Sequence, residues 1–217
     1  MADTPPLARS PISPAPPEAV TGGWVVSGSR SGAALTLTDC TPLAKVAVRA
    51  GPDGAMARDL GVPFGSAARQ SLAAGTSDDE VLVVGSGPGE WLVLAAPGQQ
   101  ADLVGLLSSL AGDQDEPVSV VDMTHGRALI RIAGERSADL LAKECAVDLG
   151  ERTFPPGAAL RSAVAGLATD LVRDDRGGTR SYLLHCERSS GQYLYDSLLD
   201  AGAEFGAETD GFVLPGI

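Results

Sequence analysis

The sequence predicts an α+β protein built from two repeated, ferredoxin-like split β-α-β units. Three observations favour this fold class. Short runs rich in Val, Leu and Ile alternate with amphipathic helical segments, an Asp-x-Thr motif recurs before two of the strands, and a strand followed by a helix recurs with it. At 217 residues and 44% hydrophobic composition, the chain can bury one core, or two cores of about a hundred residues each.

Several runs have the composition and length of β-strands. They are rich in β-branched and other aliphatic residues, which suit a pleated, half-buried surface. Only 4% of the residues are aromatic, so aliphatic side chains must build most of the core. The predicted strands are Leu35 to Leu37, Lys45 to Ala50, Val81 to Val84, Trp91 to Ala95, Val118 to Met123, Ala128 to Ile132 and Ser181 to His185.

Helical periodicity appears in three further segments. Gln99 to Leu110 carries leucines at positions i, i+3, i+4 and i+7, which places one apolar stripe on a helix. Ser137 to Cys145 and Gln192 to Leu199 likewise place their apolar residues on one face of a helix. Each of these segments is therefore expected to cover a sheet with one face.

An internal repeat suggests how the elements are grouped. Asp39-Cys40-Thr41 leads through a strand to Gly51, and Asp122-Met123-Thr124 leads through a strand to Gly134. Later in each half, Trp91 to Leu94 and Tyr182 to His185 both precede an amphipathic helix. The alternative is chance similarity between two ordinary α+β segments.

The repeat predicts two α+β units that pack into one compact body, covering residues 21–115 and 116–217. Residues 1–20 contain many prolines among Ala and Ser and predict a flexible arm without a packed core. Such an arm is either a disordered linker or a segment that becomes ordered along a neighbouring subunit.

Composition excludes several classes of function. The formal net charge of -12 would repel phosphate backbones and anionic membrane surfaces, so no nucleic-acid or membrane partner is expected. Cys40, Cys145 and Cys186 are an odd number of distant cysteines, which argues against a disulfide framework and a zinc site. With no secretory signal and no run of about 20 apolar residues, we expect a cytoplasmic protein.

The densest group of reactive side chains is Asp122, His125 and Arg127. Asp122 could orient His125 as a general base, with Arg127 as an anion clamp, if the chain turns at Gly126. The favoured interpretation is structural, in which Asp122 and Thr124 bond to the amides of a turn. These three residues are thus candidates for cofactor binding only, and no catalytic or metal-ligating residue is predicted.

Other motifs have ordinary structural interpretations. The segment Gly85 to Gly89 is expected to be a hairpin turn, because no helix follows it to bind a phosphate. Arg176 to Thr179 predicts a second turn. His185 is expected to be a buried histidine with satisfied hydrogen bonds, and the acidic runs at 78–80 and 113–116 predict solvated surface.

Several strings in the sequence resemble one known family. Val121 to Gly134, Ala138 to Leu149 and Thr153 to Gly157 look like the gamma subunit of heterotetrameric sarcosine oxidases, and Gly87 to Leu94 is similar to that family's Gly-Pro-x-Glu-Trp-Leu segment. The similarity runs from about residue 35 to residue 199. More distantly, the Asp-x-Thr-His stretch resembles the folate-binding aminomethyltransferase fold of the glycine-cleavage T-protein.

The resemblance implies a structural subunit without an active site of its own. Its expected partners are alpha, beta and delta subunits, which together oxidise sarcosine or a related N-methyl amine. FAD, FMN, NAD and tetrahydrofolate are expected in the partner subunits, and no cofactor on this chain. The alternative implied by the more distant resemblance is a folate-binding aminomethyltransferase-like enzyme or domain, with Asp122, His125 and Arg127 near its pocket.

Overall fold

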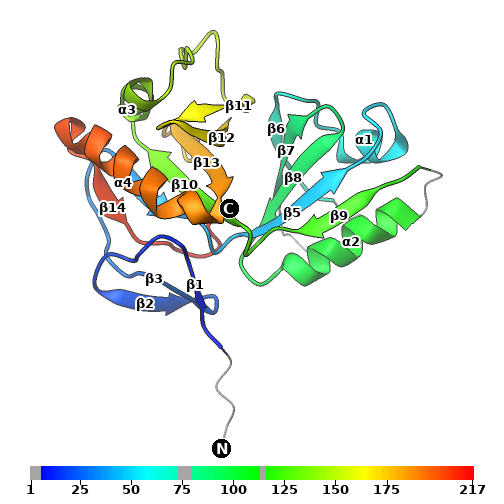
Figure 1. The fold of residues 1–217 in the computed structure, drawn as a ribbon, viewed down its shortest axis with the longest axis horizontal. Helices are drawn as coiled ribbons and strands as arrows, with labels where there is room; N and C mark the ends of the chain where they lie inside the picture. The colour runs from blue at the N-terminus through cyan, green and yellow to red at the C-terminus, as the bar shows by residue number, and fades with distance from the viewer. Residues whose placement is uncertain (1–5, 73–79, 113–115) are drawn as a thin grey trace, which may run out of the picture.

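The computed structural model describes residues 6–72, 80–112 and 116–217. Within these ranges the chain forms three β-sheets and four α-helices, and the two larger sheets face each other with helices on their outer sides (Figure 1). Most residues of the two predicted acidic runs, 78–79 and 113–115, lie outside the described ranges. The α+β class is confirmed.

The largest sheet has six strands in the order β11-β12-β13-β10-β4-β14. All neighbouring strands are antiparallel except β14 and β4, which are parallel. Helices α3 (Ser137–Glu144) and α4 (Gly191–Gly202) cover its outer face, with short 3-10 turns at Arg188–Ser190 and Ala203–Phe205 on either side of α4. The strands are Thr36–Asp39 (β4), Arg127–Ala133 (β10), Ala159–Val164 (β11), Leu167–Arg173 (β12), Ser181–Glu187 (β13) and Glu208–Asp210 (β14).

The second sheet has five antiparallel strands in the order β6-β7-β8-β5-β9. Its outer face packs against α1 (Ala55–Leu60) and α2 (Gln100–Gly112). Helix α1 was not predicted, because six residues are too few to show a helical period. The strands are Ala44–Arg49 (β5), Ala67–Gln70 (β6), Val81–Gly87 (β7), Glu90–Ala95 (β8) and Ser119–Asp122 (β9).

The N-terminal segment differs from the expected flexible arm. Strands β1 (Ala8–Arg9) and β2 (Glu18–Thr21) flank β3 (Trp24–Ser27) in a small third sheet. Ile12 is buried in the core beneath the six-stranded sheet, and Arg188 donates a hydrogen bond to the Arg9 carbonyl. The N-terminal segment packs because β3 offers unpaired backbone groups on both of its sides. Apolar residues of the segment are also buried against the body of the protein.

The two large sheets have matching strand orders. Strands β6, β7, β8, β5 and β9 of one correspond in position to β11, β12, β13, β10 and β4 of the other. The segment from β4 to β5 crosses from the six-stranded to the five-stranded sheet, and the segment from β9 to β10 crosses back. Each half of the chain therefore contributes a strand to the sheet of the other half.

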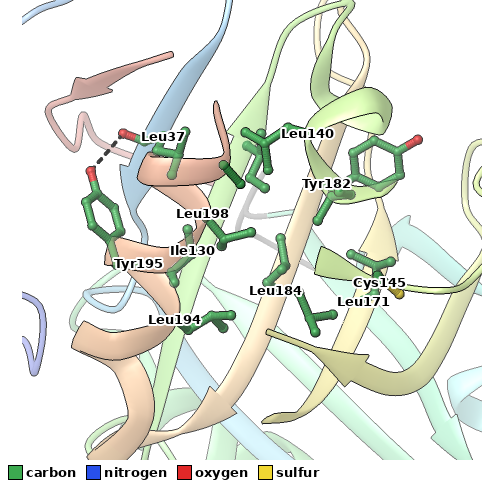
Figure 2. Packing of buried hydrophobic residues seen from close by; sticks show 14 of the residues in the cluster. Leu37, Ile130, Leu140, Cys145, Leu171, Tyr182, Leu184, Leu194, Tyr195 and Leu198 are labelled. Carbon is green, nitrogen blue, oxygen red and sulfur yellow. Dashed lines mark hydrogen bonds between the residues drawn. The ribbon is translucent and has the colours of Figure 1, made fainter. Parts of the chain in front are cut away.

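Three apolar clusters fill the space between the layers. One lies between the six-stranded sheet and α3 and α4, where Leu184, Leu194 and Leu198 pack together and the Tyr195 hydroxyl donates to the Leu37 carbonyl at 3.2 Å (Figure 2). A second lies between the five-stranded sheet and its helices. The third joins the inner faces of the two sheets.

Candidate functional site

The contact between the two sheets has an apolar centre and charged ends. Because side chains alternate along a strand, Arg127, Leu129 and Arg131 of β10 all point to the inner face. Leu129 is fully buried in the cluster between the sheets, whereas the two arginines lie on either side of it. Leu183 and His185 of β13 follow the same pattern. Polar groups from both sheets consequently meet at two separate places.

At one end, His185 and Asp170 form a buried pair. The His185 Nδ1 lies 3.1 Å from Asp170 Oδ2, and Arg161 Nε donates to the other carboxylate oxygen at 2.6 Å. Burial alone would raise the pKa of Asp170, but hydrogen bonds from His185 and Arg161 outweigh it, so its pKa lies below the ordinary value. Burial lowers the pKa of His185. A neutral His185 therefore donates from Nδ1, and Nε2 carries the lone pair.

A cavity of about 80 Å³ lies beside this pair, lined by both sheets. Three buried polar atoms of its lining have no hydrogen-bond partner among the described residues: Ser86 Oγ, Arg127 Nε and His185 Nε2. Because Ser86 Oγ and His185 Nε2 both lack a partner among these residues, they are not bonded to each other. The Ser, His and Asp side chains therefore do not form the hydrogen-bonded relay that activates a nucleophilic serine.

At the other end, three arginines surround the buried Asp174. Arg69 and Arg131 each approach a carboxylate oxygen at 2.8 Å, and Arg176 lies 3.9 Å away. Burial, followed by the charges of Arg69 and Arg131, lowers the pKa of Arg176. A pocket of about 290 Å³, lined by Arg131, Arg176 and the apolar segment around Phe212, opens beside the cluster. Positive charge exceeds negative charge in this group.

The two Asp-x-Thr motifs form the crossings between the sheets. The Thr124 amide donates to Asp122 Oδ1 at 2.8 Å, and the Thr41 amide donates to Asp39 Oδ1 at 3.0 Å. This confirms the predicted turn bond at Asp122.

Each threonine hydroxyl also accepts a hydrogen bond from a backbone amide of the strand next to the other crossing. Thr124 Oγ1 accepts from the Lys45 amide, and Thr41 Oγ1 accepts from the Leu129 amide. The Lys45 side chain is fully buried between the crossings, where its Nζ donates to the Thr41 and Leu43 carbonyls at 2.7 Å. The repeated motif thus fastens the two halves to each other.

The remaining candidates lie in different surroundings. His125 is exposed and stacks on Trp24 of β3 with ring centroids 4.9 Å apart. Arg127 forms an ion pair with Glu187 and lines the small cavity. Asp122, His125 and Arg127 thus contact three different parts of the molecule, and only Arg127 lines the cavity.

From the sequence, Ser86 is expected in a hairpin turn and His185 in a buried site where its hydrogen bonds are satisfied. The hairpin predicted at Gly85 to Gly89 is confirmed, since β7 and β8 pair up to Gly87 and Glu90, but Ser86 at its base faces the cavity. The second predicted turn is also confirmed by the hydrogen bonds between Arg176 and Thr179. His185 is buried as expected, yet within the described part of the chain only one of its ring nitrogens has a partner. The alternation of side chains along a strand is the signal that could have placed both residues on the inner faces of their sheets.

Two further features of the described residues bear on function. None of their helices is long and apolar enough to cross a membrane. Within the same ranges, no group of three or more His, Cys, Asp or Glu side chains is arranged to hold a metal ion.

A family model and several known proteins match most of this chain. The model of the GCVT N-terminal domain matches residues 36–213. The sarcosine oxidase subunit gamma of Corynebacterium sp. strain U-96 is 31% identical over 213 residues, which are 95% of this chain and 96% of that protein. The subunits gamma from Corynebacterium sp. strain P-1 and an Arthrobacter species are each 28% identical over 85% of this chain and cover 87% and 88% of their own lengths.

Two solved structures share the fold. A chain of the heterotetrameric sarcosine oxidase from Corynebacterium sp. U-96, in complex with pyrrole 2-carboxylate, matches with a TM-score of 0.64 at 24% identity, over 82% of this chain and 89% of that one. The glycine cleavage system aminomethyltransferase T from Bartonella henselae matches with a TM-score of 0.69 at 15% identity, over 89% of this chain and 55% of that one. The chain therefore belongs to the GCVT N-terminal domain family and is a homologue of sarcosine oxidase gamma subunits.

Proposed function

We propose that this chain is the non-catalytic, gamma-type subunit of a cytoplasmic heterotetrameric sarcosine oxidase-type complex. Alpha, beta and delta subunits would oxidatively demethylate sarcosine or a related N-methyl amine and pass the one-carbon unit to tetrahydrofolate. FAD, FMN, NAD and tetrahydrofolate would be bound by those subunits. The observation that carries the proposal is the similarity to a gamma subunit over 95% of this chain and 96% of the relative.

The charged groups between the sheets support a scaffolding role. Arg69 of the five-stranded sheet binds Asp174, which follows β12 of the six-stranded sheet. Arg161 of β11 lies 3.9 Å from Glu90 of β8, which is a second ionic contact across the interface. Both ion pairs link the two sheets and so favour a rigid surface for assembly.

Co-expression with the alpha, beta and delta chains of the same organism tests the proposal. The chain should co-purify with them in equal amounts, and leaving it out should lower the yield of assembled, flavin-containing complex. The purified chain alone should be colourless and inactive toward N-methyl amines. A complex that assembles and turns over normally without this chain would contradict the assignment.

The alternative is a folate-binding aminomethyltransferase-like domain. Its support is the shared fold with aminomethyltransferase T and the arginine-rich pocket beside Asp174, whose excess positive charge suits a carboxylate-bearing ligand. Calorimetry with tetrahydrofolate decides between the two. Tight binding by the isolated chain, abolished in Arg176→Gln, would favour the alternative.

The matching strand orders also support a proposal about the fold. We infer that the two halves, 21–115 and 116–217, derive from one ferredoxin-like split β-α-β unit. In the five-stranded sheet, β8 and α2 of the first half and β9 of the second form such a crossover, with β5 between the two strands. The exchange of β4 and β9 between the sheets then accounts for their compact packing.

A further inference from the structure

We propose that the cavity beside His185 binds a small oxyanion that keeps at least one hydroxyl group, such as hydrogen carbonate or dihydrogen phosphate. The inference does not depend on the subunit assignment. Among the described residues, this cavity is lined by three buried atoms without partners, which come from three strands: Ser86 Oγ, Arg127 Nε and His185 Nε2. Buried polar groups without partners are costly and rare, so together they indicate a ligand.

The donor and acceptor pattern specifies the chemistry of that ligand. Arg127 Nε can only donate a hydrogen bond, and the Ser86 hydroxyl can donate or accept. His185 Nε2 accepts, because the Nδ1 hydrogen is directed to Asp170. The ligand must therefore offer acceptors to Arg127 and Ser86 and one donor to His185. A fully deprotonated carboxylate or sulfate has no donor, whereas an oxyanion with one hydroxyl has both kinds of group.

The charges of the lining favour a single negative charge. Three arginines and two carboxylates line the cavity, which leaves one positive charge in excess. Arg49 pairs with Glu90 at 3.0 Å and Arg161 pairs with Asp170 at 2.6 Å. The excess belongs to Arg127, because its partner Glu187 lies outside the lining and is 64% exposed, where water screens its charge.

The size of the cavity agrees with such a ligand. A volume of about 80 Å³ holds roughly two or three water molecules at about 30 Å³ each, and so a molecule of a few heavy atoms. A nucleotide or a pterin is far too large. Small size and one excess positive charge thus exclude most organic cofactors from this cavity.

Paired titrations test the proposal on the full chain. Isothermal calorimetry would compare sodium phosphate, sodium hydrogen carbonate and sodium sulfate at equal ionic strength near neutral pH. Phosphate or hydrogen carbonate should bind, and sulfate should bind at least about 10-fold more weakly, because its oxygens face the lone pair of His185 Nε2 with no hydrogen to donate. Equal binding of sulfate, or no binding of either hydroxylated anion at millimolar concentration, would overturn the proposal, since ordered water would then satisfy the three atoms.

Conservative variants locate the site. Ser86→Ala removes one hydroxyl, and Arg127→Lys keeps the charge but loses the Nε donor. Each should weaken phosphate or hydrogen carbonate binding by about 10-fold, the expected loss of one hydrogen bond to a charged group. Arg136→Lys, which changes an exposed arginine that pairs with Asp139 away from the cavity, is the matched control and should bind normally. Unchanged affinity in both Ser86→Ala and Arg127→Lys would place the binding elsewhere and refute the assignment.

Discussion

Replacing the buried Lys45 by methionine should change how the stability of the fold depends on pH. Lys45 is fully buried, and burial lowers its pKa from 10.5 to about 7. As a neutral amine it has two N–H hydrogens, which match the Thr41 and Leu43 carbonyls that accept its hydrogen bonds. The folded protein is therefore adapted to the uncharged form of this side chain.

The sign of the effect follows from proton binding. Between pH 7 and 10.5, the unfolded chain binds a proton at Lys45 that the folded chain has released, so the free energy of unfolding rises with pH. The limiting slope is about 1.4 kcal/mol per pH unit, and the full shift corresponds to about 5 kcal/mol. Below pH 7 both states are protonated, and this contribution no longer varies.

Urea denaturation of the wild type and Lys45→Met at pH 7, 8 and 9 measures the effect. The difference in unfolding free energy, wild type minus variant, should increase by about 2–3 kcal/mol over this range. Methionine keeps the length and apolar stem of lysine but does not titrate. Parallel pH curves for the wild type and Lys45→Met would refute the reasoning.

Three further substitutions test the packing of the fold by denaturant midpoints. Thr124→Val should cost about 1–3 kcal/mol, because the buried Lys45 amide loses its acceptor; a neutral result would mean that the crossing is not held by this bond. Tyr195→Phe should cost about 1 kcal/mol through the loss of its hydroxyl bonds to β4 and β14, and unchanged stability would contradict their contribution. Gly89→Ala should cost at least 1–3 kcal/mol, since φ is +71° and a Cβ would lie 2.3 Å from the Ala50 carbonyl oxygen; a stable variant would show that the hairpin can shift.

Much of the secondary structure could be predicted because its signals are local. The leucine spacing from Leu103 to Leu110 marks one face of α2, and the Val- and Leu-rich runs of the β7–β8 hairpin mark its strands. Helix α1 and the short strands β1 and β2 carry too few residues to show a period. The N-terminal segment was interpreted from its prolines alone, whereas its order depends on β3, which supplies both of its strand partners.

The candidate site could be predicted only in part. Arg127 was singled out from its neighbours in sequence, but the residues that share its cavity come from β5, β7, β8, β11, β12 and β13. Asp122 and His125 are close to Arg127 in sequence, yet the turn between β9 and β10 sends their side chains to different surroundings. Proximity along the chain was therefore a poor guide to proximity at the interface between the sheets.

The sequence by itself determined the α+β class, the apolar faces of the longer helices, the turn chemistry of the Asp-x-Thr motifs and the family. These properties depend on residue type and on spacing over a few positions. Only the tertiary structure decided that β4 and β9 exchange sheets, that Lys45 is buried where they cross, and that Ser86, Arg127 and His185 line one cavity. The physical reason is that burial and hydrogen-bond satisfaction depend on which strands face each other, and strands far apart in the chain are brought together only by folding.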